Sequence, residues 1–172
     1  MKKKLVIFAT ALALSSPLSV SGQAVTSSLN GLFGITKDNI LASARMLDEE
    51  LYAFRPVEEV RSMGELFAHI AGAQYIFCAS AIGESSPSSE NFEETRTTKA
   101  SIVEALEMGF AYCDGVFADM TDADGTSVVD FFGSPNTTFG VLAFNSAHNY
   151  EHYGNLVTYM RLNGITPPSS MQ

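Results

Sequence analysis

The sequence predicts an all-α protein built as one four-helix bundle. Apolar residues recur at steps of three and four in four separate stretches. Capping residues, glycines and prolines bound these stretches, and only one short run favours a strand. A chain of 172 residues, 46% of them hydrophobic, suits one domain with a sizeable core.

The first residues have the pattern of a secretory signal peptide. Three lysines are followed by an apolar run over residues 5–14, and Gly22 and Ala24 fit a cleavage site. A membrane anchor is the weaker alternative, because this run is too short to cross about 30 Å of hydrocarbon as a helix. We therefore predict a signal peptide over residues 1–24, one mature domain over residues 25–172, and a periplasmic or secreted location.

The charge excludes several classes of partner. The chain has 10 Lys and Arg against 19 Asp and Glu, a net charge of −9. Removing residues 1–24 takes away three lysines and leaves a net charge of −12. Such a polyanion repels phosphate backbones, and no basic amphipathic stretch is present for anionic lipid. We expect no nucleic-acid partner, and no membrane partner after signal cleavage.

The first two helices have clear local signals. Residues 25–35 are small and polar and suggest an N-terminal arm, so the first helix is expected to begin at Thr36 and to end before Pro56. Ser62 and Glu65 form a capping box for the second helix, which should end near a glycine at position 83. A serine-rich loop follows.

The third helix is expected to start at residues 97–98 and to fade over residues 120–125. Residues 127–132 are β-branched and aromatic, but they have no evident strand partner. The last helix is expected to open at residues 136–138 and to end at residues 163–164, because two prolines follow.

The three histidines suggest a metal site. His148 and His152 stand four residues apart on one face of the last helix, and His69 lies on the inward face of the second helix. Three imidazoles from two facing helices can bind a divalent ion and leave one coordination position open. The alternative is three hydrogen-bonded core histidines, and spacing alone does not decide between the two.

Other polar residues on the last helix could orient the histidine rings through their second nitrogen. The candidates are Asn145, Glu151, Tyr153 and Asn155. No carboxylate lies on the histidine face, so the sequence predicts no fourth protein ligand and identifies no catalytic base.

Two segments resemble the DinB-like family of metal-dependent enzymes. Residues 62–71 resemble its segment G-E-L-hydrophobic-x-H. Residues 148–156 resemble its last helix, H-x-x-x-H-x-G-Q-hydrophobic, and residues 159–168 resemble the following Y-x-R-x-x-G-x-x-P-P. These segments lie toward both ends of the mature domain. One departure is Asn155, where the family often has the longer Gln.

The resemblance implies a bundle with up-down-down-up order and a divalent metal held by His69, His148 and His152. Zinc or nickel is expected first and iron next. Characterised relatives include thiol S-transferases and a thiol-dependent isomerase, and the common homodimers of the family leave a homodimer open here.

The same topology bears on the two cysteines. If the second and third helices run parallel, Cys78 and Cys113 both lie about 23 Å along their helices. A disulfide between them is then geometrically possible, and we expect it in an oxidising compartment. The alternative is two buried free thiols.

Three functional hypotheses follow. The first is a metal-dependent enzyme acting on a small molecule, either hydrolase or thiol-transferase-like. Secretion favours hydrolysis, because the thiol cofactors of characterised relatives are cytosolic. The second is a metal-binding protein without turnover, and the third is a metal-free helical binding module whose phenylalanines form a groove.

Overall fold

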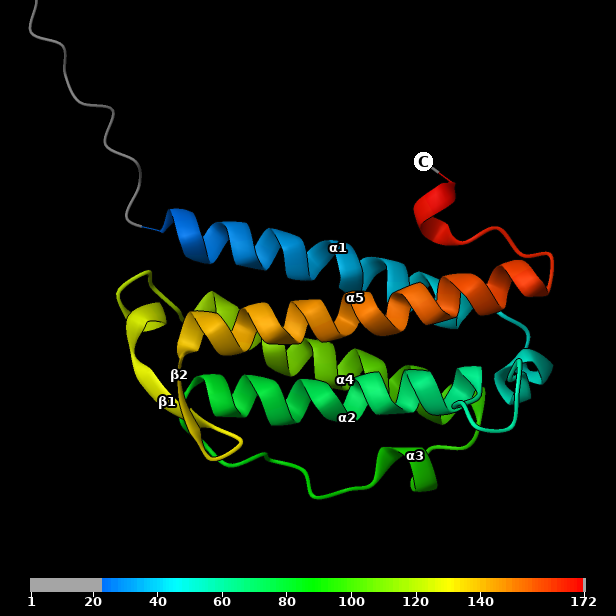
Figure 1. Cartoon of the computed structure of the whole chain (residues 1–172), viewed down its shortest axis with the longest axis horizontal. Coiled ribbons are helices and arrows are strands. Elements are labelled where there is room, and N and C mark those ends of the chain that lie inside the picture. Colours follow the sequence, from blue (N-terminus) through cyan, green and yellow to red (C-terminus); the bar gives the residue numbers. More distant parts are fainter. Residues whose placement is uncertain (1–22, 172) are drawn as a thin grey trace, which may run out of the picture.

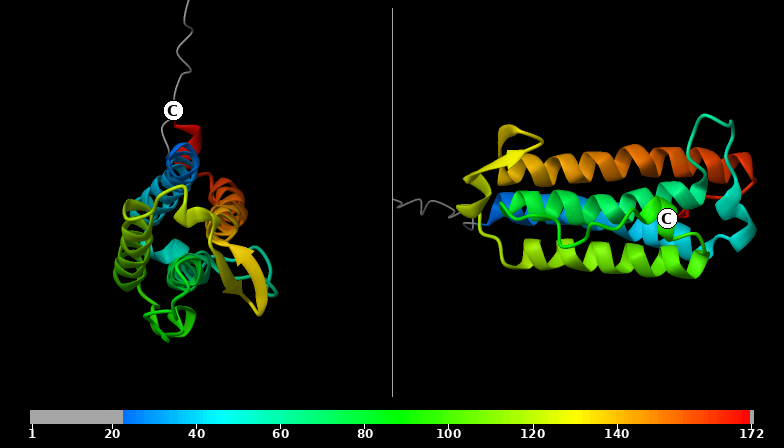
Figure 2. Two further views of the ribbon diagram at one scale, coloured as in Figure 1. Left: turned by 90° about the vertical axis from the view of Figure 1, so that its left-hand side faces the viewer. Right: turned by 90° about the horizontal axis from the view of Figure 1, so that it is seen from below.

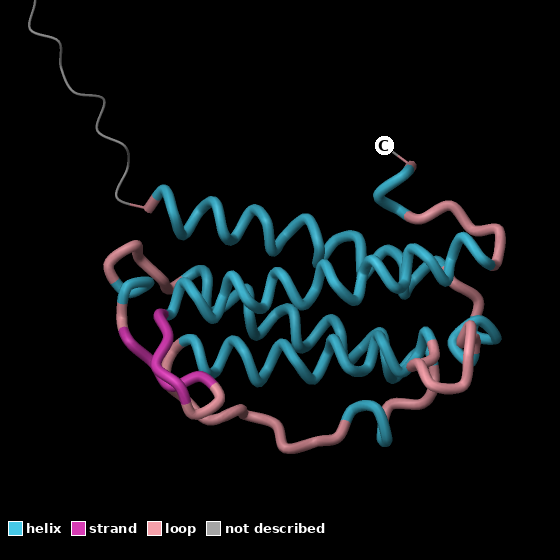
Figure 3. The backbone as a smooth tube through the Cα atoms, in the orientation of Figure 1, coloured by secondary structure: helices cyan, strands magenta, loops and turns pink. Residues whose placement is uncertain are grey.

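The structure, a computed structural model, describes residues 23–171 (Figure 1, Figure 3). The predicted all-α class is confirmed, with one short hairpin added. The predicted signal peptide, residues 1–24, lies almost entirely outside the described residues. The α-helices are α1 (Ala24–Met46), α2 (Met63–Ala81), α3 (Phe92–Thr95), α4 (Lys99–Ala118) and α5 (Thr138–Leu162). The strands are β1 (Val128–Phe131) and β2 (Ser134–Thr137), and short 3-10 helices span Glu49–Ala53, Asp124–Thr126 and Pro168–Ser170.

The four long helices pack side by side around one core (Figure 2). In Figure 1, α1 and α5 run in one direction and α2 and α4 run in the other. Helix α2 packs against both α4 and α5, so its faces serve two different interfaces. None of the described helices is long and apolar enough to cross a membrane.

Helix α1 begins earlier than the sequence predicts. It starts at Ala24 rather than Thr36, so the predicted N-terminal arm is wrong. The carboxylate of Asp122, in the loop after α4, accepts hydrogen bonds from the backbone N–H groups of Val25 (3.2 Å) and Thr26 (2.8 Å). These bonds satisfy N–H groups that a helix start leaves free, and they lower the pKa of Asp122. A cap from a distant loop therefore overrides the weak local helix propensity.

Helices α2 and α4 begin where the sequence predicts. The Ser62 hydroxyl accepts a hydrogen bond from the Glu65 backbone N–H (3.2 Å), and the Glu65 carboxylate accepts one from the Ser62 backbone N–H (2.7 Å). Thr98 caps α4 by accepting a hydrogen bond from the Ser101 N–H (3.2 Å). Gly83, just past the end of α2, has a φ of 73°. Cys78 in α2 and Cys113 in α4 form a disulfide, with Cα atoms 5.5 Å apart.

Two elements were not predicted. The strand-like run at Val128–Phe131 does find a partner, the antiparallel strand Ser134–Thr137. The partner has no hydrophobic alternation and contains a proline, so it carries no strand signal of its own. The four-residue helix α3, Phe92–Thr95, lies in the connection between α2 and α4, where Phe92 is buried.

Candidate metal centre

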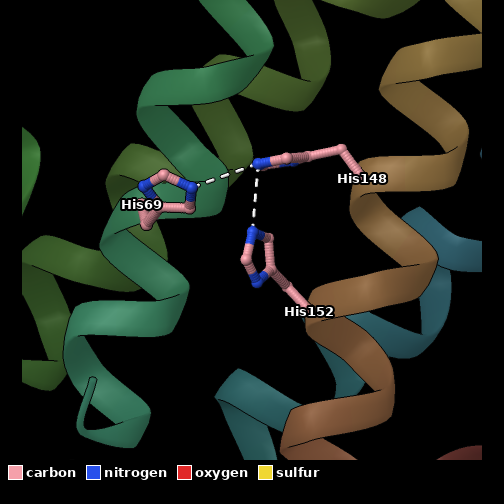
Figure 4. A group of neighbouring side chains, drawn as sticks. All are labelled: His69, His148 and His152. Atoms are coloured by element: carbon pink, nitrogen blue, oxygen red, sulfur yellow. Dashed lines mark hydrogen bonds between the residues drawn. The ribbon is translucent and has the colours of Figure 1, made fainter. Parts of the chain in front are cut away.

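The three histidines converge between α2 and α5. Figure 4 shows His69 reaching from α2 toward His148 and His152 on α5. The Nε2 atom of His148 lies 3.1 Å from Nε2 of His69 and 3.0 Å from Nε2 of His152. The structure thus brings the three predicted ligands together, each with one ring nitrogen within 4.8 Å of the others.

This spacing fits a shared cation. Two nitrogens bound to a metal at about 2.0–2.1 Å lie about 3.0 Å apart at a right angle and about 3.4 Å apart at a tetrahedral angle. The observed separations of 3.1 and 3.0 Å match this range. No carboxylate or cysteine joins the three histidines among residues 23–171, so the protein would supply three ligands. Three nitrogen ligands leave room for a small ligand from solution.

The protonation state of the cluster also suits metal binding. Burial, followed by the neighbouring His152 and His69, lowers the pKa of His148 to about 3. Burial also lowers the pKa of His152, with His69 adding to the effect. These two rings are therefore neutral near pH 7, and a neutral imidazole has one nitrogen lone pair available for a metal.

Glu93, from α3, determines which nitrogen of His69 faces the centre. Its carboxylate lies 2.8 Å from Nδ1 of His69 and also pairs with Arg61 at 2.8 Å. Burial by itself raises the pKa of Glu93, but the hydrogen bonds from Arg61 and His69 bring it below its ordinary value. The ionised carboxylate accepts the Nδ1–H of His69, which leaves the Nε2 lone pair directed at the other two histidines.

The neutral rings cannot satisfy all of these contacts alone. With His69 Nε2 acting as an acceptor, the ring protons provide a hydrogen for only one of the two short nitrogen–nitrogen contacts. Two lone pairs, or two N–H groups, then face each other in the second contact. A cation bound between the three nitrogens removes this repulsion.

The structure shows no hydrogen bond from the four predicted ring-orienting residues to a histidine ring. Asn145 donates to the side-chain oxygen of Gln74 (3.0 Å), and Tyr153 donates its hydroxyl hydrogen to Ser169 (2.9 Å). Glu151 and Asn155 are exposed and make no hydrogen bond to a histidine. The sequence prediction missed Glu93 because it lies 24 residues from His69 in the short helix α3, with no motif to mark it.

The interior beside the histidines contains more polar groups. Gln74 donates to the side-chain oxygen of Asn149 (2.9 Å) and accepts from Asn145, and all three residues are fully buried. Asn145 also approaches the disulfide sulfur of Cys78 at 3.4 Å. Buried amides therefore link α2 and α5 next to the disulfide.

A small cavity of about 260 Å³ opens beside His69 and His148. Its polar lining includes Glu90, Asn91 and Glu93. The rest of its lining is apolar and consists of Ala68, Gly72, Ala73, Ile76, Phe77, Phe92 and Phe132. A larger cavity of about 670 Å³, bounded by α2, α4 and the hairpin, has no histidine in its lining. The smaller cavity, called the histidine cleft below, is the place where a ligand can reach the cluster.

The comparisons with known proteins agree with this architecture. The sequence profile of the DinB superfamily matches residues 32–156. A DinB-like protein from Bacillus cereus ATCC 10987 has a similar structure, with a TM-score of 0.72 and 19% identity over 83% of this chain and 95% of that one. A DinB-like protein from Bacillus subtilis gives a TM-score of 0.63 and 22% identity over 83% and 92%.

A third similar structure is the mycothiol-dependent maleylpyruvate isomerase, with a TM-score of 0.64 and 17% identity over 76% of this chain and 60% of that one. At these identities the likeness shows the fold alone. No curated protein sequence matches the chain.

Proposed function

Because the chain belongs to the DinB superfamily, we propose that it is a metal-dependent enzyme whose His69, His148 and His152 hold one divalent ion beside the histidine cleft. The observation that carries this proposal is the convergence of three ring nitrogens, with Nε2 of His148 3.1 Å from that of His69 and 3.0 Å from that of His152. When bound, a divalent ion supplies Lewis acidity and lowers the pKa of a water or thiol that binds to it. Zinc and nickel suit three imidazoles, and iron is the next alternative.

The protein's own residues have separate tasks in this proposal. His69, His148 and His152 bind the ion, and Glu93 holds His69 in the tautomer that can do so. Phe77 and Ile76 in the cleft wall exclude bulk water from the substrate. No described carboxylate is close enough to complete the ligand set, so a coordination position stays free for substrate or water.

We propose hydrolysis of a small molecule as the reaction class. The signal-peptide pattern over residues 1–24 and the disulfide between Cys78 and Cys113 support a periplasmic or secreted location. Low-molecular-weight thiol cofactors are cytosolic, so a thiol-dependent reaction would lack its co-substrate there, whereas hydrolysis needs only water.

A second candidate is thiol transfer. The structural likeness to the mycothiol-dependent maleylpyruvate isomerase favours it, because the name of that enzyme states a thiol requirement. The two reactions are separated by testing product formation with and without an added thiol.

Metal content of the mature protein, purified without a histidine tag, tests the proposal. We expect about one equivalent of zinc or nickel in the parent and none in a His148→Ala, His152→Ala double variant. An Asn155→Ala variant is the matched control, because Asn155 is exposed on the same helix. A parent that takes up neither zinc nor nickel, and whose Tm is unchanged when they are added, would refute the metal centre.

A positive result justifies a substrate screen. Esters, lactones and amides with small acyl groups test hydrolysis, and the same metal-loaded protein with added thiol tests transfer. Turnover that is lost in the double variant and kept in Asn155→Ala separates an enzyme from a protein that only stores the ion.

A further inference from the structure

The tip of the hairpin has an unusual residue for its backbone conformation. Phe131 pairs with Ser134, so Phe132 and Gly133 form a two-residue turn with φ values of 53° and 78°. Turns in which both central residues have positive φ favour Asn-Gly or Asp-Gly. A bulky side chain at positive φ is strained, and Phe132 is the one non-glycine residue with positive φ within residues 23–171.

Burial does not offset this strain. The Phe132 side chain is 73% exposed, about as much as Val128 on the same hairpin at 74%. Val128, however, lies in a regular strand, whereas Phe132 combines exposure with an unfavourable backbone. A residue with a strained backbone and little burial contributes little to folding, which points to another role.

The Phe132 ring belongs to the wall of the histidine cleft. It lies 6.2 Å from the ring of Phe77 in an edge-to-face arrangement, and Phe77 packs edge-on against His148 at 5.0 Å. A continuous aromatic surface therefore runs from the hairpin tip to a metal-binding histidine. The opposite side of the cleft carries Glu90 and Glu93, and each carboxylate is already paired with an arginine.

We propose that Phe132 is a specificity-determining residue that holds an apolar, ring-sized group of the substrate against the aromatic wall while the polar group of the substrate meets the metal. The substrate class is then a small carbonyl compound with an aromatic or branched apolar group directly beside the carbonyl. The cleft volume of about 260 Å³ limits it to a small molecule. This inference rests on the proposed metal-dependent function and deepens it.

Two hydroxamates serve as probes, because both chelate zinc through the same group. Benzohydroxamate carries a ring and acetohydroxamate a methyl group. Their affinities for the zinc-loaded protein are measured by calorimetry in the parent, in Phe132→Asn, and in the control Val128→Thr. In the parent we expect benzohydroxamate to bind about tenfold more tightly, as partial burial of a ring predicts. The same preference is expected in Val128→Thr, and it should fall to about threefold or less in Phe132→Asn.

The Tm provides a second readout. Phe132→Asn relieves the strain of the turn, so we expect its Tm to rise by about 2–4 °C while its zinc content stays at the parent value. Equal hydroxamate preferences in Phe132→Asn and the parent, or a lower Tm in Phe132→Asn, would overturn the inference about Phe132. The proposed metal site would be unaffected by either result. A parent that binds no zinc would overturn the proposed function and this inference with it.

Discussion

Helix α2 packs against two neighbours with opposite chemistry. Toward α4 the buried residues are mostly apolar, and the disulfide between Cys78 and Cys113 joins the two helices. Toward α5 the buried residues include several that are polar. The buried residues of α4 are Ile102, Ala105, Leu106, Gly109, Phe110, Cys113, Val116 and Phe117. The buried polar side chains of α5 include Asn145, Ser146, Asn149 and His152.

The two interfaces also differ in how well their polar atoms are satisfied. Among the described residues, five buried side-chain polar atoms lack a hydrogen-bond partner, and all of them lie on α5. They belong to Asn145, Ser146, His148, Asn149 and His152. Unsatisfied buried groups cost stability, so the buried side of α5 is less favourable for folding than the buried side of α4. The disulfide-linked α2–α4 pair therefore stabilises the bundle, whereas α2 and α5 carry the three histidines of the proposed metal site.

Removing a large core side chain of α4 should have the largest effect on stability. Phe110 is 1% exposed and packs on Phe33 of α1, so Phe110→Ala should lower the free energy of unfolding by about 3–5 kcal/mol. Urea unfolding measures this, and Met108→Ala, on the exposed side of α4, is the control. Zinc affinity of the folded variant should stay at the parent value, and a large loss would show that the core packing of α4 and the histidine cluster are not separable.

Removing the disulfide tests the α4 side of α2. The Cys78→Ala, Cys113→Ala double variant should lose about 2–4 kcal/mol of unfolding free energy, because the bond closes a loop with a sequence separation of 35 residues. Reduced parent protein should unfold at a similarly lowered urea concentration. Identical urea midpoints for oxidised parent and variant would contradict a stabilising role for this bond.

Glu93→Gln tests the histidine side of α2. It should change zinc affinity much more than it changes the free energy of unfolding. The variant keeps an oxygen acceptor near His69 but loses the negative charge, so zinc affinity should fall by about 10- to 100-fold. Competition with a chromogenic chelator measures this affinity. Glu94→Gln, on an exposed neighbour in α3, should bind zinc like the parent. Unchanged affinity in Glu93→Gln would mean that the His69 tautomer does not depend on this carboxylate.

The smallest expected effect on stability is at the N-terminus of α2, the helix that takes part in both interfaces. A hydrogen bond from the Ser62 backbone N–H is the main cause that lowers the pKa of Glu65 below its model-compound value of 4.5. A carboxyl with a lowered folded-state pKa stabilises the protein above its unfolded-state pKa and loses this contribution as the pH falls through the folded-state value. The stability gap between the parent and Glu65→Gln should therefore be present at pH 7 and shrink below about pH 4.5.

Urea unfolding over this pH range measures the gap, with Glu59→Gln at an exposed position as the control. A gap that grows on acidification would contradict the capping role of Glu65.

Features that depend on near neighbours were predictable from the sequence. The capping box joins Ser62 to Glu65, and Thr98 caps α4 through Ser101, each over three residues. His148 and His152 share a face because a helix repeats at this spacing. The fold class and the three histidines therefore followed from local patterns and from the family resemblance.

Features that depend on distant residues were not predictable. The start of α1 relies on Asp122, 96 residues from Thr26, and the partner of Asn145 is Gln74, 71 residues away. A local capping signal placed the helix start at Thr36, and helical spacing placed Asn145 beside the histidines.

The sequence by itself determined the fold class, the starts and caps of α2 and α4, and the three candidate histidines, because each of these depends on residue type and short spacing. Only the tertiary structure decided that Glu93 contacts His69, that Phe132 lines the histidine cleft, and that α2 packs against both α4 and α5. The physical reason is that these features need side chains from separate elements to meet at hydrogen-bonding or van der Waals distance. Chain packing sets such distances, and no local sequence pattern encodes them.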